Sequence, residues 1–168
     1  MTVISNGTNL INNGTLDSAV PTGKMTLIKT LTASGSANLS FVDGASSVVL
    51  DDTYDSYVFK YINIHPASVA QLTVNFRDGG TAYDATKTTT AFNSSHNEND
   101  SGDGLVYRTA WDLAQSTSDQ IIAQELGNGA DECGSGYLQL FNPSSTTFVK
   151  HFIGVTNYYQ NFGATGSF

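Results

Sequence analysis

Short runs of alternating apolar and polar residues, separated by Gly, Asn, Asp and Pro, recur along most of the chain. Residues 71–76 alternate Gln, Thr and Asn with Leu, Val and Phe, a period of two that predicts a strand with one wet face. Residues 56–65 carry apolar side chains on both faces and end at Pro66, which predicts a central strand covered on both sides. Short strands spaced by turns, with little helical periodicity, are typical of an all-β sandwich or jelly roll.

Other segments complete this assignment. Residues 136–142 and 147–157 flank a Pro-Ser-Ser turn, which predicts a β-hairpin. Two segments are ambiguous: residues 110–115 are compatible with one helical turn, and residues 120–126 with a strand or a helix, of which we favour the strand. We expect further strands at 25–32, 37–41, 48–50 and 86–92, the last an edge strand, and exposed polar loops at 93–104 and 127–135.

The composition agrees with a folded β domain. The chain has 168 residues, the size of one domain, and only 13% are charged. Eight Tyr, nine Phe and one Trp demand burial, which argues against a disordered chain, and the scarcity of Lys, Arg and Glu argues against a coiled coil. Scaling predicts that the folded chain exposes roughly 8,000 Å² of about 26,000 Å² in the unfolded chain. We therefore expect an all-β, antiparallel β-sandwich that is jelly-roll-like.

The first 24 residues differ from the rest. Asn6-Gly7 and Asn13-Gly14 are turn signals, and the short apolar runs beside them are too small for a hairpin core. We expect residues 1–24 to form an extended N-terminal arm and residues 25–168 to form the sandwich domain.

Charge and cysteine content restrict the partners. The net charge is −8, so the basic surface that nucleic acids or anionic membranes require is lacking. No apolar run is long enough for a transmembrane helix, and residues 1–23 do not resemble a secretory signal. Cys133 is the single cysteine, which excludes an internal disulfide or a Cys-based zinc site and leaves its own role open.

Four segments carry a family likeness. They are residues 27–32 (LIKTLT), 39–44 (LSFVDG), 57–66 (YVFKYINIHP) and 141–152 (FNPSSTTFVKHF). Taken in order, they resemble a poorly characterised family of marine bacteriophage proteins, over roughly residues 1–157. The resemblance implies a virion structural protein, tail-fibre-like or decoration-like, made in the host cytoplasm. Family members continue for several more strands, which leaves open whether Phe168 is the natural C-terminus or the sandwich is truncated.

The resemblance supplies no catalytic residues, and the sequence adds none. His65, His96 and His151 have no metal-ligand spacing and are read as strand or loop histidines. A Ser-His-Asp hydrolase needs an exposed serine on a strained Gly-x-Ser-x-Gly turn. The nearest run, residues 133–136 (CGSG), does not match it. We therefore expect no enzyme.

Acidic side chains gather in two places. Asp51, Asp52 and Asp55 are weak candidates for Ca²⁺, because carboxylates are its usual ligands, while the bland interpretation is solvated turn acids. Glu98, Asp100 and Asp103 form the second group. There, residues 97–102 fit the first half of a calcium loop, but Arg108 stands where the bidentate Glu belongs. Paired carboxylates would also suit a glycan depolymerase, but no pairing is visible.

Aromatic residues beside polar loops are the remaining candidates. Tyr54, Tyr83, Tyr107 and Trp111 could stack on a host-surface glycan or a partner protein, although core packing is the default for each. The pair Tyr158-Tyr159 suits an interface anchor. We expect a non-enzymatic virion component that needs no cofactor, contacts other virion proteins and forms a homo-oligomer, with a trimer favoured. The alternatives are a carbohydrate-binding module or receptor-binding adhesin, and then a glycan depolymerase.

Overall fold

The computed structural model describes residues 2–5, 7–12, 14–17 and 25–161, and this part of the chain contains strands and no helix. The all-β prediction is therefore confirmed. The strands are β1 (Thr2–Ser5), β2 (Thr8–Asn12), β3 (Thr15–Leu16), β4 (Ser56–Ile64), β5 (Ala70–Val74), β6 (Lys87–Thr89), β7 (Phe92–Ser95), β8 (Gly104–Tyr107), β9 (Leu113–Ser116), β10 (Gln120–Leu126), β11 (Gly134–Phe141) and β12 (His151–Tyr158).

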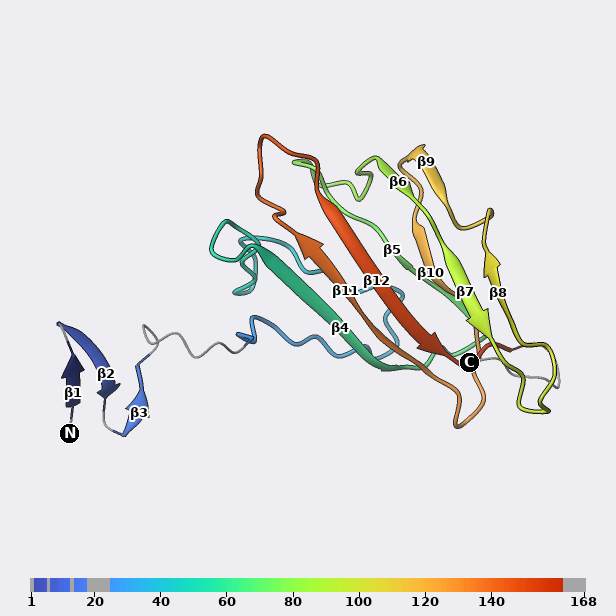
Figure 1. Ribbon diagram of the computed structural model, residues 1–168, viewed down its shortest axis with the longest axis horizontal. Helices are drawn as coiled ribbons and strands as arrows, with labels where there is room; N and C mark the ends of the chain where they lie inside the picture. The colour runs from blue at the N-terminus through green and yellow to red at the C-terminus, as the bar shows by residue number, and fades with distance from the viewer. Residues whose placement is uncertain (1, 6, 13, 18–24, 162–168) are drawn as a thin grey trace.

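The largest sheet of the main body has three antiparallel strands in the order β12-β11-β4 (Figure 1). The predicted hairpin is β11 and β12, which pair without interruption from Gly134↔Tyr158 to Phe141↔His151. The prediction of a central, doubly covered strand at residues 56–65 was wrong. That segment is β4, at the edge of the sheet, and β11 holds the centre. Apolar residues on both faces of β4 thus indicate an exposed apolar surface rather than a second covering layer.

The pleat of this sheet separates an inner face from an outer one. Tyr57 on β4 pairs with Leu140 on β11, and Phe59 pairs with Leu138. Tyr57, Leu138 and Leu140 are buried, so these positions define the inner face. The residues between them on each strand point to the opposite side.

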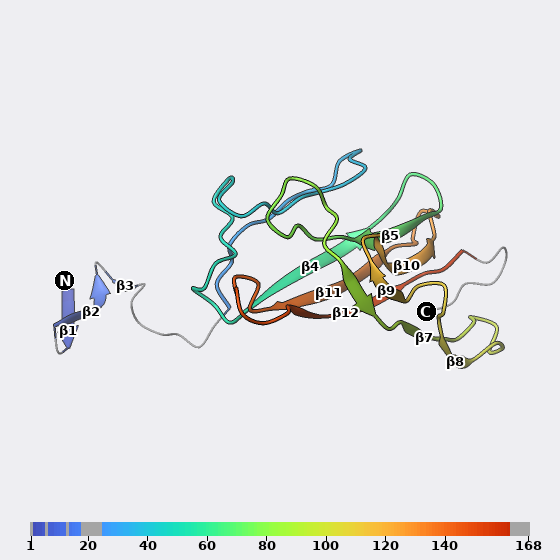
Figure 2. The same cartoon turned by 90° about the horizontal axis from the view of Figure 1, so that it is seen from above.

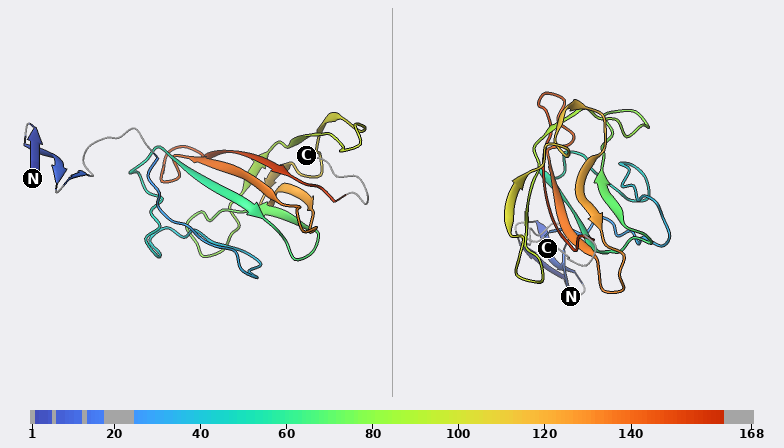
Figure 3. Two further views of the ribbon diagram at one scale, coloured as in Figure 1. Left: turned by 90° about the horizontal axis from the view of Figure 1, so that it is seen from below. Right: turned by 90° about the vertical axis from the view of Figure 1, so that its right-hand side faces the viewer.

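A second layer covers the inner face, as the two turned views show (Figures 2 and 3). It contains the pairs β10-β5 and β6-β9, both antiparallel. Phe76, just after β5, packs its ring 5.0 Å from that of Phe152 on β12, which joins the layers. Two packed antiparallel layers form a β-sandwich, while the jelly-roll connectivity stays a prediction.

Residues 25–50 do not form the three strands expected at 25–32, 37–41 and 48–50. The backbone has positive φ at Gly35, Gly44, Ser46 and Ser47, which breaks the extended conformation that a ladder needs. The expected turn at Asp43-Gly44 is present. The segment still contacts the sheet, because the ring of Phe41 lies 5.4 Å from that of Phe59. The alternation of apolar and polar residues therefore identified a segment that packs against the sheet but forms no strand of it.

Between residues 70 and 126 the structure contains strands near the predicted ones, but with different first and last residues. β5 has the expected wet face, and residues 120–126 are the strand β10. The edge strand expected at 86–92 is only β6, and the helical turn considered at 110–115 is instead a turn followed by β9. The long loop expected at 93–104 is shorter, because β7 and β8 pair from Phe92↔Tyr107 to Ser95↔Gly104.

The described residues of the expected N-terminal arm contain three short strands. β1 pairs with β2 and β2 with β3, all antiparallel. Gly7 and Gly14 have φ of 80° and 83°, the left-handed conformation that tight hairpin turns demand. The Asn-Gly turn signals were therefore right. The short runs were large enough to pair although Ile4 and Leu16 stay exposed. Residues 18–24 of the expected arm and 162–168 of the expected domain lie outside the described residues.

The described part of the chain has a small core, made of a few buried side chains such as Val48, Tyr57, Trp111, Leu126 and Leu138. Among the described residues, Leu126 is the largest side chain that is fully buried. No helix in that part of the chain is long and apolar enough to cross a bilayer.

Candidate functional site

The outer sheet face is the most unusual surface of the described structure. We define it by Val58 on β4, Tyr137 and Phe141 on β11, and Ile153 and Val155 on β12, which the strand register places on one side. Tyr137 is 41% exposed, Ile153 58% and Val155 52%. A solvated face of an antiparallel sheet normally carries polar side chains. Here Val58, Tyr137, Phe141, Ile153 and Val155 surround one polar side chain, Gln139, at the centre of the face, so the face is more apolar than a solvated one usually is.

The register explains why these side chains form one patch. Tyr137 lies directly opposite Val155, and Gln139 lies opposite Ile153. Side chains opposite one another in an antiparallel pair are about 5 Å apart at Cβ and therefore touch. Of the neighbouring strand residues on this face, Lys60 carries a charge and no residue is acidic. The three strands of this sheet contain no Asp or Glu, in a protein of net charge −8.

β12 adds an open edge to this surface. Among the described strands, β12 forms a backbone ladder with β11 alone. The opposite edge of His151–Tyr158 therefore has backbone donors and acceptors outside any ladder, although β10 lies close to the end of β12, where Leu126 bridges to Gln160. Such an edge can accept a strand from another chain, and it adjoins Ile153 and Val155.

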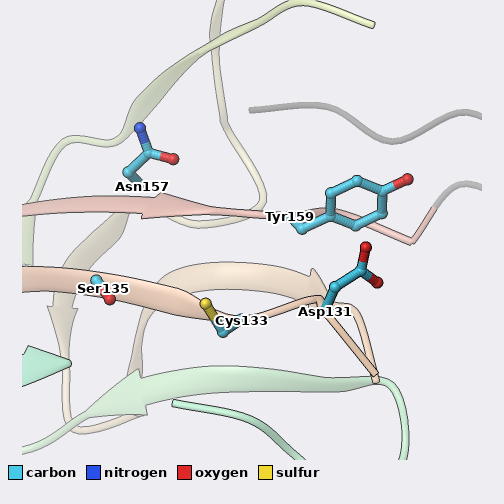
Figure 4. A pocket seen from close by; sticks show the side chains of 5 residues that line it. All are labelled: Asp131, Cys133, Ser135, Asn157 and Tyr159. Carbon is cyan, nitrogen blue, oxygen red and sulfur yellow. The ribbon is translucent and has the colours of Figure 1, made fainter. Parts of the chain in front are cut away.

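A shallow cavity of about 230 Å³ lies at the far end of the same face, lined by Asp131, Cys133, Ser135, Asn157 and Tyr159 (Figure 4). Ser135 Oγ accepts a hydrogen bond of 2.9 Å from the backbone N–H of Asn63, and Cys133 Sγ lies 3.9 Å from Asn63 Oδ1. No histidine lines the cavity. Ser135 lies within β11 rather than on the strained turn that carries the nucleophile of a serine hydrolase.

The three histidines lie apart from this cavity. His65 Nε2 is 3.0 Å from the carbonyl oxygen of Gly129, and His96 Nε2 is 3.2 Å from Asp100 Oδ1. His151 is exposed at the start of β12. Each histidine therefore has a separate local environment.

The acidic candidates are not assembled into a cation site. The described residues contain no group of three or more His, Cys, Asp or Glu that could hold a metal ion. Asp51 Oδ1 accepts 2.8 Å from the N–H of Thr53 and 3.4 Å from the hydroxyl of Tyr57. The side chain of Thr53 is the main cause that lowers the pKa of Asp51, followed by the hydrogen bond from the Thr53 backbone. Asp52 and Asp55 are exposed in the same region, so Ca²⁺ at these residues stays a prediction.

Trp111 does not lie on a surface. It is 6% exposed, and its Nε1 donates 2.7 Å to Oε1 of Gln124. The guanidinium of Arg108 lies 5.4 Å from the centre of the indole ring. Trp111 is therefore a core residue, which removes it from the candidates for stacking on a glycan.

The three tyrosine candidates are exposed but are held in different ways. Tyr54 packs edge-on against Tyr57, with ring centres 5.8 Å apart. The Arg77 guanidinium lies 4.4 Å from the ring centre of Tyr83, so it occupies one stacking face. The hydroxyl of Tyr107 donates 2.6 Å to Asp112 Oδ2. The structure records no contact between any two of these rings, so they form no shared platform for a sugar.

Sequence reasoning missed the outer face. The sequence did contain a signal for this face. Alternate positions of the hairpin carry apolar side chains, namely Tyr137, Phe141, Ile153 and Val155. The two faces could not be told apart without knowing that Leu138 and Leu140 face the second layer.

The fold and surface define the class as an all-β sandwich with an exposed apolar sheet face. No known family model, curated protein or solved structure matches the chain.

Proposed function

We propose that this chain is a non-enzymatic structural protein whose subunits assemble through the outer sheet face. The place of action that we propose is a phage particle, as a tail-fibre or capsid-decoration component made in the host cytoplasm. This location rests on the resemblance of four sequence segments to marine phage proteins. The assembly role rests on the surface of the molecule and needs no cofactor.

One observation supports assembly above all others. Ile153, Val155 and Tyr137 lie together on the outer sheet face and are 58%, 52% and 41% exposed, although the solvated face of an antiparallel sheet normally carries polar side chains. Apolar side chains exposed together in this way are typical of a surface that a partner subunit covers. Symmetric oligomers are the usual result when one chain carries a self-complementary surface, and a trimer is our favoured state.

Charge favours the outer face as the contact. Copies that each carry −8 repel one another. Tyr137, Ile153 and Val155 approach a partner without adding a carboxylate to the interface. The expected contact therefore combines apolar side chains with polar ones such as Gln139, as protein interfaces commonly do.

The test is the mass of the full chain in solution, measured by light scattering behind a sizing column. We expect an oligomer for the unmodified chain and monomers for Ile153→Asp, since a buried unpaired carboxylate is strongly disfavoured. Leu27→Asp is the matched control, because Leu27 is 81% exposed and lies outside this sheet. It should leave the oligomer intact.

A folded, monomeric unmodified chain would overturn the assembly proposal. The next candidate would then be a carbohydrate-binding module or adhesin, for which the exposed rings of Tyr54, Tyr83 and Tyr107 are the contacts to test by glycan titration. Dissociation by Leu27→Asp but not by Ile153→Asp would support assembly and move the interface away from the outer face.

A further inference from the structure

Lys87, on β6, is a lysine buried in the second layer. It is 6% exposed, and the described part of the chain places no carboxylate within ion-pair distance of its Nζ. Nζ instead donates 2.7 Å to the carbonyl oxygen of Ala85 and 2.5 Å to Oδ1 of Asn75. A buried ammonium without a paired anion is costly, so the neutral amine is favoured here relative to water.

Asn75 follows β5, and its side-chain amide is held at both ends. Its Oδ1 accepts 2.9 Å from the backbone N–H of Phe76 in addition to the bond from Lys87. Its Nδ2 donates 2.7 Å to Asp119 Oδ1 and 3.1 Å to the carbonyl oxygen of Thr117. The hydroxyl of Thr73 lies 3.4 Å from Asp119 Oδ2 and orients that carboxylate.

We propose that Lys87 and Asn75 form a covalent isopeptide bond, with Asp119 as the catalytic residue that transfers the proton. The geometry contains an amine, an amide carbonyl and a carboxylate linked by hydrogen bonds through Asn75. Nζ lies 2.5 Å from Oδ1, and the carbonyl carbon is one C=O bond of about 1.2 Å away from that oxygen. The nucleophile is therefore already beside the group that it attacks.

The reaction balances without any co-reactant. The Lys87 ammonium first loses a proton to solvent, and the neutral Nζ then attacks Cγ of Asn75 while the C=O electron pair moves to Oδ1. The backbone N–H of Phe76 stabilises the resulting oxyanion. Once the attack has bonded Nζ and Nδ2 to the same carbon, the Nζ proton comes within reach of Asp119, which is hydrogen-bonded to Nδ2. Asp119 then takes that proton from Nζ and delivers it to Nδ2. The Cγ–Nδ2 bond breaks, and ammonia leaves.

The electrostatic environment agrees with an amine nucleophile. Burial is the main influence on the pKa of Lys87 and lowers it, while the more distant carboxylates of Asp119, Asp84 and Asp78 act in the opposite direction. A desolvated lysine is a recognised way of producing a nucleophilic amine. The bond would join the end of β5, which pairs with β10, to β6, which pairs with β9. It would therefore tie two small sheets together without a disulfide.

The experiment is mass spectrometry of the full chain, purified and then denatured. We expect the intact mass to be lower than the sequence mass by about 17 Da, the mass of one ammonia. Trypsin cleaves after Lys60, Arg77 and Arg108 but not after an acylated Lys87. The digest should therefore contain residues 61–77 joined to residues 78–108 as one branched peptide.

Variants separate catalysis from folding. Asp119→Asn should have the full mass and release a free peptide ending at Lys87, whereas Asp84→Asn, the matched control, should keep the deficit of about 17 Da. A bond that forms equally in Asp119→Asn would overturn the role of Asp119. An unmodified chain with full mass would overturn the bond itself, as would the same deficit found only in linear peptides, the mark of a local succinimide. The intact mass and the peptides of the denatured chain do not depend on the assembly state. A negative result here would therefore leave the proposed function untouched, and a monomeric chain would leave this inference untouched.

Discussion

The hydroxyl of Tyr61 on β4 lies 2.5 Å from Oγ1 of Thr156 on β12, so one side chain spans the full width of the three-stranded sheet. The same hydroxyl donates 3.1 Å to the carbonyl oxygen of Val155. Gly136 on β11 makes this possible, because a Cβ at that position would collide with the Tyr61 ring and with the Val155 backbone. Gly136 in the central strand therefore leaves room for the Tyr61 side chain, which connects the two edge strands.

Gly136→Ala should destabilise the protein. The added methyl group must displace Tyr61 and the β12 backbone, and overpacking of this kind costs about 1–3 kcal/mol. Chemical denaturation monitored by tyrosine and tryptophan fluorescence measures the change. Gly154→Ala is the matched control, since a Cβ there would lie 3.7 Å from the Tyr137 carbonyl oxygen, an ordinary contact. Equal losses for the two variants would contradict the role given to Gly136.

Leu126→Ala should lower the free energy of unfolding by about 2–5 kcal/mol, because it leaves a cavity in the core. Leu126 is 2% exposed and ends β10. Leu27→Ala removes the same atoms from a side chain that is 81% exposed. Its effect should stay within about 0.5 kcal/mol. Urea denaturation of the two variants gives the comparison, and a small effect for Leu126→Ala would place the core elsewhere.

Gln120→Glu should destabilise the protein in a pH-dependent way. Gln120 is 4% exposed, and its Nε2 donates 2.9 Å to each of the carbonyl oxygens of Trp111 and Ile121. A carboxylate there would face two acceptors, and a buried unpaired charge costs about 3–5 kcal/mol.

The sign of the pH effect follows from this burial. The folded protein would raise the pKa of the introduced carboxyl group above that of a glutamate in the unfolded chain, which is about 4.3. The loss should therefore be small at low pH and grow as the pH rises through and above that value. Gln71→Glu, at an exposed position on β5, is the control and should show no such trend. Thermal melts at several pH values between acid and neutral measure both.

Stability should fall above about pH 10, the pKa of an unfolded tyrosine. Burial raises the pKa of Tyr57, with a smaller contribution from the charge of Asp51, and burial also raises the pKa of Tyr61. The unfolded chain then loses its tyrosine protons before the folded chain does. The stabilising contribution is complete below about pH 10 and is lost as the pH rises through the folded values.

Tyr57→Phe tests this assignment. The variant loses the hydrogen bond of 2.9 Å from the Tyr57 hydroxyl to the Asp51 carbonyl oxygen, so it should be less stable at neutral pH. Its stability should also decline less steeply above about pH 10 than that of the unmodified chain. Denaturation curves at neutral and at alkaline pH provide the slopes, and parallel slopes would contradict the prediction.

Local sequence patterns were sufficient to predict several of the strands. Residues 71–76 alternate strictly, and β5 has the expected wet face. Residues 136–157 form the expected hairpin because a turn between two strand-like runs brings them together at once. Residues 25–50 show the limit of this reasoning, since Ala37, Leu39 and Phe41 alternate without a partner strand. Pairing depends on a neighbour that is often distant in sequence, which alternation does not reveal.

The surfaces were harder to predict than the strands. Trp111 beside a polar segment gave no sign that its indole would be buried against β10 and hydrogen-bonded to Gln124. Asn75, Lys87 and Asp119 are separated by up to 44 positions and share no recognisable motif. Their meeting depends on which strands stand side by side, so no local spacing could have indicated it.

The sequence by itself determined that this protein is built of short β-strands, because alternation, turn residues and a scarcity of charges act over a few residues at a time. Only the tertiary structure decided that β11 rather than β4 is central, that Tyr137, Ile153 and Val155 face outward, and that Lys87 lies against Asn75. These features arise from contacts between distant segments. Which face of a strand is buried is settled by the layer that covers it, and not by the strand's own residues.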